Sequence, residues 1–381
     1  MAYVLNCFHL GKPKQTLWAL LPAVALAVTV PNRRVPQRAV PITYTLTMAA
    51  KTGDTIRGKT LTGFKLPSSG PNASAINTSE NVAFYATYSQ GDLVGEGIFT
   101  ATSSVLKSGD VFSGQTVEGI SFVPALNDRG AVAVRCLFSS QQSAILASNA
   151  LIAKTGDTIG GQILTSVGLP AINNNGTVAF VGSFSTGTGV FTQKAVLARS
   201  DDLVAGKAPT SFGPPAINDR GTVAFQSWFS GKIATAIVTP TGLLVKTGDT
   251  IAGKTLIDLF FGPTLNSSGV VAFVGVFSGG TGIFTQRDLL LQAGDTIGGQ
   301  TLTSFGYPVI SDSGIVAFFA TYPGGEGIFT QTALIVKTGD TVCGRTLIGV
   351  GQPSISKAGT VAFTALFSDR SSAIVLARPN N

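Results

Sequence analysis

The sequence K-T-G-D-T-I at residues 154–159, followed by P-A-I-N-N-N-G-T-V-A-F at residues 170–180, decides the fold because both motifs recur along the chain. We call the first the KTGD motif and the second the NxxG motif. The aspartate of the KTGD motif or its variants recurs as Asp54, Asp110, Asp157, Asp202, Asp249, Asp295 and Asp340, at intervals of 56, 47, 45, 47, 46 and 45 residues. Seven units of about 46 residues indicate a closed radial array of repeats.

The NxxG motif follows each of these aspartates and ends on a large apolar residue. Its copies end at Phe84, Val134, Phe180, Phe225, Phe273, Phe318 and Phe363. Four residues further on, every unit has an aromatic residue: Tyr88, Phe138, Phe184, Phe229, Phe277, Tyr322 or Phe367. Side chains four residues apart in a β-strand lie on the same face. We therefore expect these two positions to form the core of each unit.

One unit divides into four short strands. In the sixth unit, a strand ends at residue 310, a turn covers residues 311–314, and strands at 315–322, 327–331 and 333–337 flank a glycine-rich turn at 323–326. Short strands rich in Val, Ile, Phe and Thr at this period are typical of propeller blades. No amphipathic helical pattern of ten residues or more follows residue 42. The sequence predicts an all-β fold, a seven-bladed β-propeller of four-stranded repeats.

The two ends of the repeat region predict how the ring closes. Residues 372–378 align with the third strand of a unit, so the last blade lacks one strand. Residues 42–50 align with a fourth strand and precede the first KTGD motif. We expect this N-terminal strand to complete the last blade and to cover its open edge. The weakest unit is the fourth; a long loop at residues 199–207 would leave six blades.

Charge and composition exclude some classes of partner. Only 12% of the 381 residues are charged, 46 are glycine, and the net charge is +7. Five basic residues and no acidic residue precede the repeats, namely Lys12, Lys14, Arg33, Arg34 and Arg38. The remaining 21 basic and 19 acidic residues nearly balance. We therefore predict no nucleic-acid partner, because such proteins need a strongly positive surface.

Residues 1–41 differ from the repeats. Lys12 and Lys14 precede an apolar run at residues 17–30, which contains A-L-A at residues 25–27. This pattern is typical of a secretory signal peptide. We predict a signal peptide at 1–27, a Pro/Arg-rich linker at 28–41 and a propeller at 42–381, in a secreted, periplasmic or cell-surface protein. An uncleaved N-terminal anchor is the alternative; we predict no other membrane span, and a monomer.

Cysteine and histidine are nearly absent. The cysteines are Cys7, Cys136 and Cys343, and the last two occupy different parts of different units, so we predict no disulfide. The one histidine, His9, lies in the predicted leader. A His-based metal site or a Ser-His-Asp triad is therefore excluded from the repeats. We predict no cofactor, and carboxylate chemistry remains open.

The repeated polar residues are interpreted first as turn residues. An aspartate in G-D-T-I-x-G can accept hydrogen bonds from amides two or three residues further on; calcium binding at these turns is the alternative. Asparagine and glycine of the NxxG motif suit a four-residue turn. The asparagines are Asn77, Asn127, Asn173, Asn218 and Asn266, with Ser311 and Ser356 in the last two units. Glu80 replaces the glycine in the first unit, which we interpret as tolerated turn variation.

The motif N-x-x-G-x-x-A-F, intact at residues 173–180 and 218–225, resembles the hallmark of the choice-of-anchor tandem-repeat NxxGxxAF family of bacterial proteins. The resemblance covers roughly residues 50–370. It implies export, often with a C-terminal sorting signal that this chain lacks, and no established molecular function. More distantly, P-x-I-N-x-x-G-x-V-A-F resembles the blades of TolB-like propellers, which would place the inner strand before the NxxG turn.

That register places the loops between the second and third strands on one face with the KTGD loops. The variable residues there are the candidate binding residues: Asp92, Glu96, Trp228, Lys232, Glu326, Asp369 and Arg370. Trp228 is expected either to pack at the rim or to stack on a sugar. We predict a binding or cell-surface interaction module for a protein or a glycan. The alternatives are a carbohydrate-active hydrolase or lyase that pairs Glu96 with Glu326 or Asp92 with Asp369, and a structural surface component.

Overall fold

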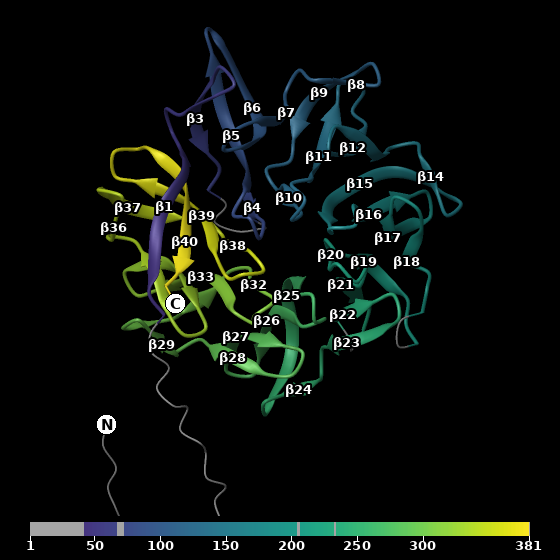
Figure 1. Cartoon of the computed structure of the whole chain (residues 1–381). Coiled ribbons are helices and arrows are strands. Elements are labelled where there is room, and N and C mark those ends of the chain that lie inside the picture. The colour runs from purple at the N-terminus through teal and green to yellow at the C-terminus, as the bar shows by residue number, and fades with distance from the viewer. Residues whose placement is uncertain (1–41, 67–71, 204–205, 232–233, 381) are drawn as a thin grey trace, which may run out of the picture. The chain divides into compact units, whose positions relative to one another are not determined.

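The computed structural model describes residues 42–66, 72–203, 206–231 and 234–380. The chain divides into two compact units, residues 1–39 and 40–381, and the described residues belong to the second. The predictions for residues 1–41 lie outside them. All regular elements of the described residues are β-strands, grouped into seven blades (Figure 1).

The strands of the first four blades follow the chain. Blade 1 contains β2 (Thr55–Ile56), β3 (Lys59–Phe64), β4 (Ser74–Ile76), β5 (Val82–Gln90), β6 (Leu93–Thr100) and β7 (Ser104–Lys107). Blade 2 contains β8 (Val111–Phe112), β9 (Gln115–Ile120), β10 (Ala125–Leu126), β11 (Val132–Phe138), β12 (Ser143–Ala147) and β13 (Ala150–Lys154). Blade 3 contains β14 (Thr158–Ile159), β15 (Gln162–Ile172), β16 (Val178–Phe184), β17 (Gly187–Thr192) and β18 (Val196–Arg199). Blade 4 contains β19 (Pro209–Phe212), β20 (Ala216–Ile217), β21 (Val223–Phe229), β22 (Thr235–Thr239) and β23 (Gly242–Lys246).

The last three blades repeat this order. Blade 5 contains β24 (Thr250–Ile251), β25 (Lys254–Leu265), β26 (Val271–Phe277), β27 (Gly280–Thr285) and β28 (Leu289–Gln292). Blade 6 contains β29 (Thr296–Ile297), β30 (Gln300–Thr301), β31 (Ser304–Phe305), β32 (Val309–Ile310), β33 (Val316–Tyr322), β34 (Gly325–Thr330) and β35 (Leu334–Lys337). Blade 7 contains β36 (Thr341–Val342), β37 (Arg345–Val350), β38 (Ser354–Ile355), β39 (Val361–Phe367), β40 (Ser372–Pro379) and the N-terminal β1 (Tyr44–Lys51).

The predicted closure of the ring is confirmed. Strand β1 pairs with β40 in antiparallel register, from Tyr44 opposite Pro379 to Lys51 opposite Ala373. The inner segments contact one another in sequence around the ring, from β4 to β10, β15, β20, β25, β32, β38 and back to β4. In Figure 1 the labels β4, β10, β20, β25, β32 and β38 surround the centre of the ring. Because the fourth unit forms the sheet β19-β21-β22-β23, the ring has seven blades, not six.

The predicted aromatic positions form the core. In blade 3, the Phe180 and Phe191 rings stack at 5.8 Å between centroids, and the Phe184 ring meets Phe191 edge-on at 6.2 Å. Phe180 is fully buried and packs in one cluster with Ala133 and Ile145 of blade 2. Burying each such side chain contributes about 1.5–3 kcal/mol. The repeated aromatics therefore hold neighbouring blades together as well as each blade.

The hairpins between the second and third strands are tighter than the sequence predicts. Tyr322 pairs with Gly325 across a two-residue turn, where Gly324 has a φ of 93°. In blade 1, Gln90 pairs with Leu93 across another two-residue turn. Glu96 and Glu326, which we expected in loops, therefore lie within strands β6 and β34. A positive φ at the turn glycine lets the strands continue almost to the tip of the hairpin.

Candidate functional site

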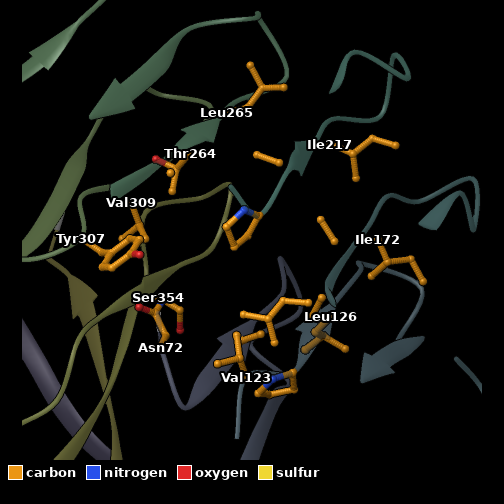
Figure 2. Close-up of a pocket in the computed structure, with 18 of the residues that line it drawn as sticks. Asn72, Val123, Leu126, Ile172, Ile217, Thr264, Leu265, Tyr307, Val309 and Ser354 are labelled. Carbon is orange, nitrogen blue, oxygen red and sulfur yellow. The ribbon is translucent and has the colours of Figure 1, made fainter. Parts of the chain in front are cut away.

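The axis of the ring contains a chamber of about 330 Å³ (Figure 2). Its walls are the inner strands and the residues that lead into them, including Leu126, Ile172 and Ile217. None of the described residues that line it is charged. Five lining residues are prolines, namely Pro124, Pro170, Pro214, Pro215 and Pro263. The chamber is therefore uncharged and mainly apolar, and the five prolines contribute no backbone N–H group to its wall.

The chamber lies on the side of the ring that carries the hairpins between the second and third strands. Each inner strand runs away from that side toward the NxxG turn, and the next strand returns antiparallel to it. Those hairpins lie beside the KTGD loops. The amide of Glu326, next to a hairpin, donates to the hydroxyl of Thr338 in a KTGD loop at 3.4 Å. We call this side the loop face and the other the NxxG face. The prediction that both kinds of loop share one face is confirmed.

The entrance of the chamber is lined by a repeat position that varies strongly. It is the residue directly before the repeated proline: Val123, Leu169, Pro214, Gly262 and Tyr307. Our sequence reasoning missed these residues because it searched only the loops for variation. The sequence did contain a signal for them: the P-x-I-N sequence is repeated, whereas the residue directly before it differs from unit to unit. The repeat brings this position to the axis in five of the units.

Tyr307 is held firmly at the entrance. Its ring centroid lies 4.2 Å from that of Phe261, and its backbone N–H donates to Gln352 Oε1 at 3.0 Å. Phe261 has a φ of 63°, a conformation that costs a phenylalanine about 1–3 kcal/mol. Burial raises the pKa of Tyr307. Its hydroxyl makes no hydrogen bond within the described residues and points toward the chamber (Figure 2).

A ring of seven aliphatic residues separates the chamber from a second cavity of about 180 Å³ at the NxxG face. These residues are Ile76, Leu126, Ile172, Ile217, Leu265, Ile310 and Ile355, and they line both cavities. The walls of the second cavity also include Asp128, Asp219, Asp312 and Lys357. The axis is thus apolar toward the loop face and charged toward the NxxG face.

An ionic network crosses this charged mouth. Lys357 of blade 7 donates to Asp128 Oδ2 of blade 2 at 2.6 Å and also to Asp219 of blade 4. Asn174 of blade 3 donates to the same two carboxylates at 2.8 and 2.9 Å. Burial alone would raise the pKa of Asp128, but hydrogen bonds from Asn174, Lys357 and Thr78 outweigh it and lower that pKa. These charges are therefore paired with one another.

The repeated asparagines do more than the predicted capping of their own turns. Asn173 Oδ1 accepts from the amides of Asn175 and Thr177 at 3.1 and 3.0 Å, as the sequence predicts. Its Nδ2 also donates to the carbonyl of Asn218 in the next blade at 3.0 Å. The same bond recurs from Asn77, Asn127, Asn218 and Asn266, each to the following blade. These bonds link blades 1 to 6 around the axis.

Glu80 supplies a link where this circle of asparagines is open. Ser356 in blade 7 has no amide group to donate to blade 1. Instead, Glu80 accepts from Thr360 Oγ1 at 2.9 Å and from Arg378 Nε at 2.6 Å, both in blade 7. Glu80 takes the glycine position of the turn, in line with our interpretation as turn variation, and it also joins the first blade to the last. It does so with a φ of 61°, the conformation of the glycine it replaces.

The KTGD aspartates are turn residues, but their bonds run in the direction opposite to our prediction. Asp157 Oδ2 accepts from the amide of Lys154, three residues earlier, at 2.9 Å. Its Oδ1 accepts from the Lys154 ammonium, also at 2.9 Å. The amide bond recurs in all seven units. Among the described residues, no group of three or more Asp, Glu, Cys or His side chains is placed to hold a metal ion.

The two glutamates among the predicted binding residues join neighbouring blades. Glu96 Oε1 accepts from the amide of Ile120 in blade 2 at 3.2 Å, and its Oε2 accepts from Tyr85 at 2.5 Å. Glu326 Oε1 accepts from the amide of Val350 in blade 7 at 3.1 Å. The glutamates occupy equivalent positions of blades 1 and 6, and Glu326 lines an open cavity with Thr338 and Ile348 that Glu96 does not line.

The other predicted binding residues are not brought together. Asp92 lies exposed in the blade 1 hairpin turn. Trp228 is half-buried in blade 4 and packs on Gly213, where a Cβ atom would lie 3.1 Å from the indole. Asp369 and Arg370 form the turn before β40, where Asp369 accepts from the Ser371 amide at 2.9 Å and lies 3.3 Å from Arg345. Lys232 lies outside the described residues.

Two further features bear on the sequence predictions. Within the described residues no disulfide joins Cys136 to Cys343; the first is buried and the second exposed. In the part of the chain that the structure describes, no helix is long and apolar enough to span a membrane.

Comparisons with known proteins identify a family. The profile of a family described as "Family of unknown function (DUF7453)" matches residues 43–287 and 140–374. No curated protein sequence matches the chain.

Several solved structures resemble the chain distantly. A streptogramin B lyase is 12% identical with a TM-score of 0.39, and the alignment covers 88% of this chain and 98% of the lyase. A virginiamycin B lyase from Staphylococcus aureus is 10% identical with a TM-score of 0.37, covering 87% and 99%. The polysaccharide lyase Uly1 is 10% identical with a TM-score of 0.42, covering 90% and 100%. At this distance, none bears on the ligand or activity of this chain.

Proposed function

We propose that this chain, which belongs to the DUF7453 family of unknown function, is an exported, monomeric binding module that receives part of a protein or glycan ligand in its axial chamber. The apolar chamber beneath a varied entrance is the observation that carries this proposal. Pockets of about 300–1,000 Å³ with mainly apolar walls and a few polar groups are typical ligand sites. The chamber of about 330 Å³ lies at the small end of that range.

The distribution of repeated and varied residues supports the same function. The repeated Asp and Asn side chains are engaged in turns and in bonds between blades. The residues that break the repeat at the axis instead surround an open chamber. A rigid scaffold that presents varied residues around a cavity is suited to recognition.

A hydrolase or lyase with paired carboxylates is supported less well. Such chemistry needs two carboxyl groups about 5–10 Å apart across a shared cleft. Glu96 and Glu326 each accept a backbone amide of a neighbouring blade, and Asp369 is bonded to Ser371 and paired with Arg345. These carboxylates stabilise the scaffold, so binding is the function that the geometry favours.

The experiment that tests this function uses the full chain on an array of secreted proteins and glycans, with and without calcium. Reproducible binding is expected, independent of calcium. The variant Ala171→Leu, which narrows the chamber, is expected to abolish it. Ala101→Leu adds the same side chain at an exposed turn position and serves as the matched control.

The same two variants show which outcomes would contradict binding in the chamber. Circular dichroism must first show that each retains the β-rich spectrum of the wild-type chain. Binding that survives Ala171→Leu as well as Ala101→Leu would move the ligand site away from the chamber. A blank array from folded wild-type protein would contradict the binding function itself.

A further inference from the structure

We infer that the group held in the chamber is an uncharged aliphatic side chain of a protein ligand, whose backbone carbonyl accepts a hydrogen bond from the Tyr307 hydroxyl. This inference rests on the proposed binding function and names the ligand class of the same site. It follows from the charge, the hydrogen-bonding groups and the volume of the chamber.

The chamber offers no partner for a charged group. None of its lining residues among those described is ionisable except Tyr307, whose pKa is raised by burial. The charges next along the axis line the second cavity: Lys357 is bonded to Asp128 and Asp219. Asp312 accepts hydrogen bonds from Ser267 instead. A charged group in the chamber would lose its hydration without compensation, which is strongly unfavourable. The ligand group is therefore uncharged.

The chamber is also poor in hydrogen-bonding groups for a sugar. Its prolines have no N–H group, and two of its four hydroxyl side chains are engaged within the scaffold. Thr264 Oγ1 donates to the Pro308 carbonyl at 3.0 Å, and Ser354 Oγ donates to the Ala362 carbonyl at 3.4 Å. A sugar carries several hydroxyl groups, and each one buried without a partner costs about 1–3 kcal/mol. An aliphatic group avoids this cost, so the walls favour a protein side chain over a glycan.

The volume sets the size of the group. A cavity of roughly 150 Å³ lined by aliphatic and aromatic side chains stays dry and binds benzene. The chamber, at about 330 Å³, is about twice as large. It therefore accommodates one large or two smaller aliphatic side chains.

The polar groups without partners indicate how the ligand is oriented. Tyr307 makes no side-chain hydrogen bond within the described residues, and its ring is fixed by Phe261. Ser74 Oγ, buried in a strand that lines the chamber, has no partner there either. A ligand that brings a carbonyl to Tyr307 would replace solvent at a hydroxyl that bonds to no described group of the scaffold. A peptide supplies such a carbonyl beside each side chain.

The experiment compares three small probes on the full chain by saturation-transfer NMR. N-acetyl-leucinamide carries the aliphatic group and the carbonyl, methyl glucoside represents a glycan, and N-acetyl-aspartate amide adds a charge to the peptide probe. We expect saturable binding of the leucine probe alone. Ala171→Leu should weaken it at least tenfold, and Ala101→Leu should leave it unchanged. Tyr307→Phe should weaken it about 2- to 12-fold, the effect of one hydrogen bond.

The outcomes separate this inference from the proposed function. Binding of methyl glucoside, abolished by Ala171→Leu, would overturn the aliphatic ligand while the chamber stays the binding site. Binding of the leucine probe that is equal in all variants would show contact outside the chamber and overturn both. If Ala171→Leu fails to fold, Tyr307→Phe decides, because an unchanged affinity in that variant contradicts the orientation of the peptide.

Discussion

The Lys357 ammonium lies 2.6 Å from the Asp128 carboxylate, although the residues are 229 positions apart and belong to blades 7 and 2. The bond crosses the axis at the NxxG face and continues to Asp219 and Asn174. This network joins blade 7, which closes the ring, to blades 2, 3 and 4 across the axis. Four of the predictions below concern such links, which stabilise the ring independently of its ligand.

Removing this cation is expected to destabilise the ring. Lys357→Met leaves Asp128 and Asp219 without their counter-ion. The side chains of Lys357, Asp128 and Asp219 are 24–35% exposed. We therefore expect the free energy of unfolding to fall by about 1–2 kcal/mol, a value between those of exposed and buried ion pairs. Urea unfolding of Lys357→Met, Asp128→Asn and the double variant measures the coupling. Strict additivity of the two single changes would contradict a direct interaction.

The same network predicts a dependence of stability on acid. Burial alone would raise the pKa values of Asp128 and Asp219, but hydrogen bonds from residues of other blades outweigh it and lower both pKa values below the ordinary value near 4. Their contribution is therefore complete above about pH 4 and is lost as the pH falls toward the folded-state pKa values. Urea midpoints measured from pH 6 down to pH 2.5 should fall more steeply for the wild type than for Asp128→Asn. Parallel curves for the two proteins would be the contrary result.

The circle of asparagines gives a graded test. Asn173→Ser keeps an oxygen for the turn, as Ser311 and Ser356 do in their own blades, but loses the bond to Asn218. Asn173→Ala loses both. We expect losses of about 1 kcal/mol for the serine variant and about 2–3 kcal/mol for the alanine variant. Thermal or urea unfolding measures them, and equal losses would mean that the bond between blades contributes nothing.

At Glu80 two effects oppose each other. Glu80→Gly restores the motif and relieves the strain of a positive φ, which stabilises by roughly 1 kcal/mol. It also removes the charged hydrogen bonds to Arg378 and Thr360, which together contribute about 2–3 kcal/mol. We expect a net loss of about 1–2 kcal/mol in the free energy of unfolding, measured by urea unfolding. A stabilised Glu80→Gly protein would mean that Glu80 is turn variation alone.

The cysteines should differ in reactivity. Burial raises the pKa of the Cys136 thiol to about 11, whereas Cys343 is exposed. In a Cys7→Ser background, we expect a disulfide reagent at pH 8 to modify Cys343 quickly and Cys136 only on unfolding. Counting modified thiols with and without urea checks this. Rapid reaction of both thiols in the native protein would contradict the burial of Cys136.

The fold was predictable because each blade depends on short-range pattern. The alternation of side chains along a strand, the turn glycines and the aromatic pair Phe180 and Phe184 all lie within one unit. Each of these patterns indicates a strand or a turn without reference to the rest of the chain. The closure by β1 was predictable because a missing strand and a spare strand stand at opposite ends of the chain. The hairpin turns were misjudged at Glu96 and Glu326, since two-residue turns let the strands run further than their glycines suggest.

The site was not predictable in the same way. The search for variation in loops selected Asp92, Trp228 and Asp369, which the structure leaves apart from one another. It passed over Tyr307, one residue before a repeated proline, because only the loops were searched for variation. Only its position at the axis reveals that its hydroxyl is directed at a cavity (Figure 2).

The sequence by itself determined the seven repeat units, the all-β propeller fold, the core aromatics and the strand that closes the ring, and the structure settled that the fourth unit is a blade. Each of these follows from contacts within a unit or from counting units. The tertiary structure alone decided which residues meet across the axis, as Lys357 meets Asp128, and that an apolar chamber lies beside a charged mouth. Those relationships join residues from different units, and their geometry exists only after seven twisted sheets have packed into a closed ring.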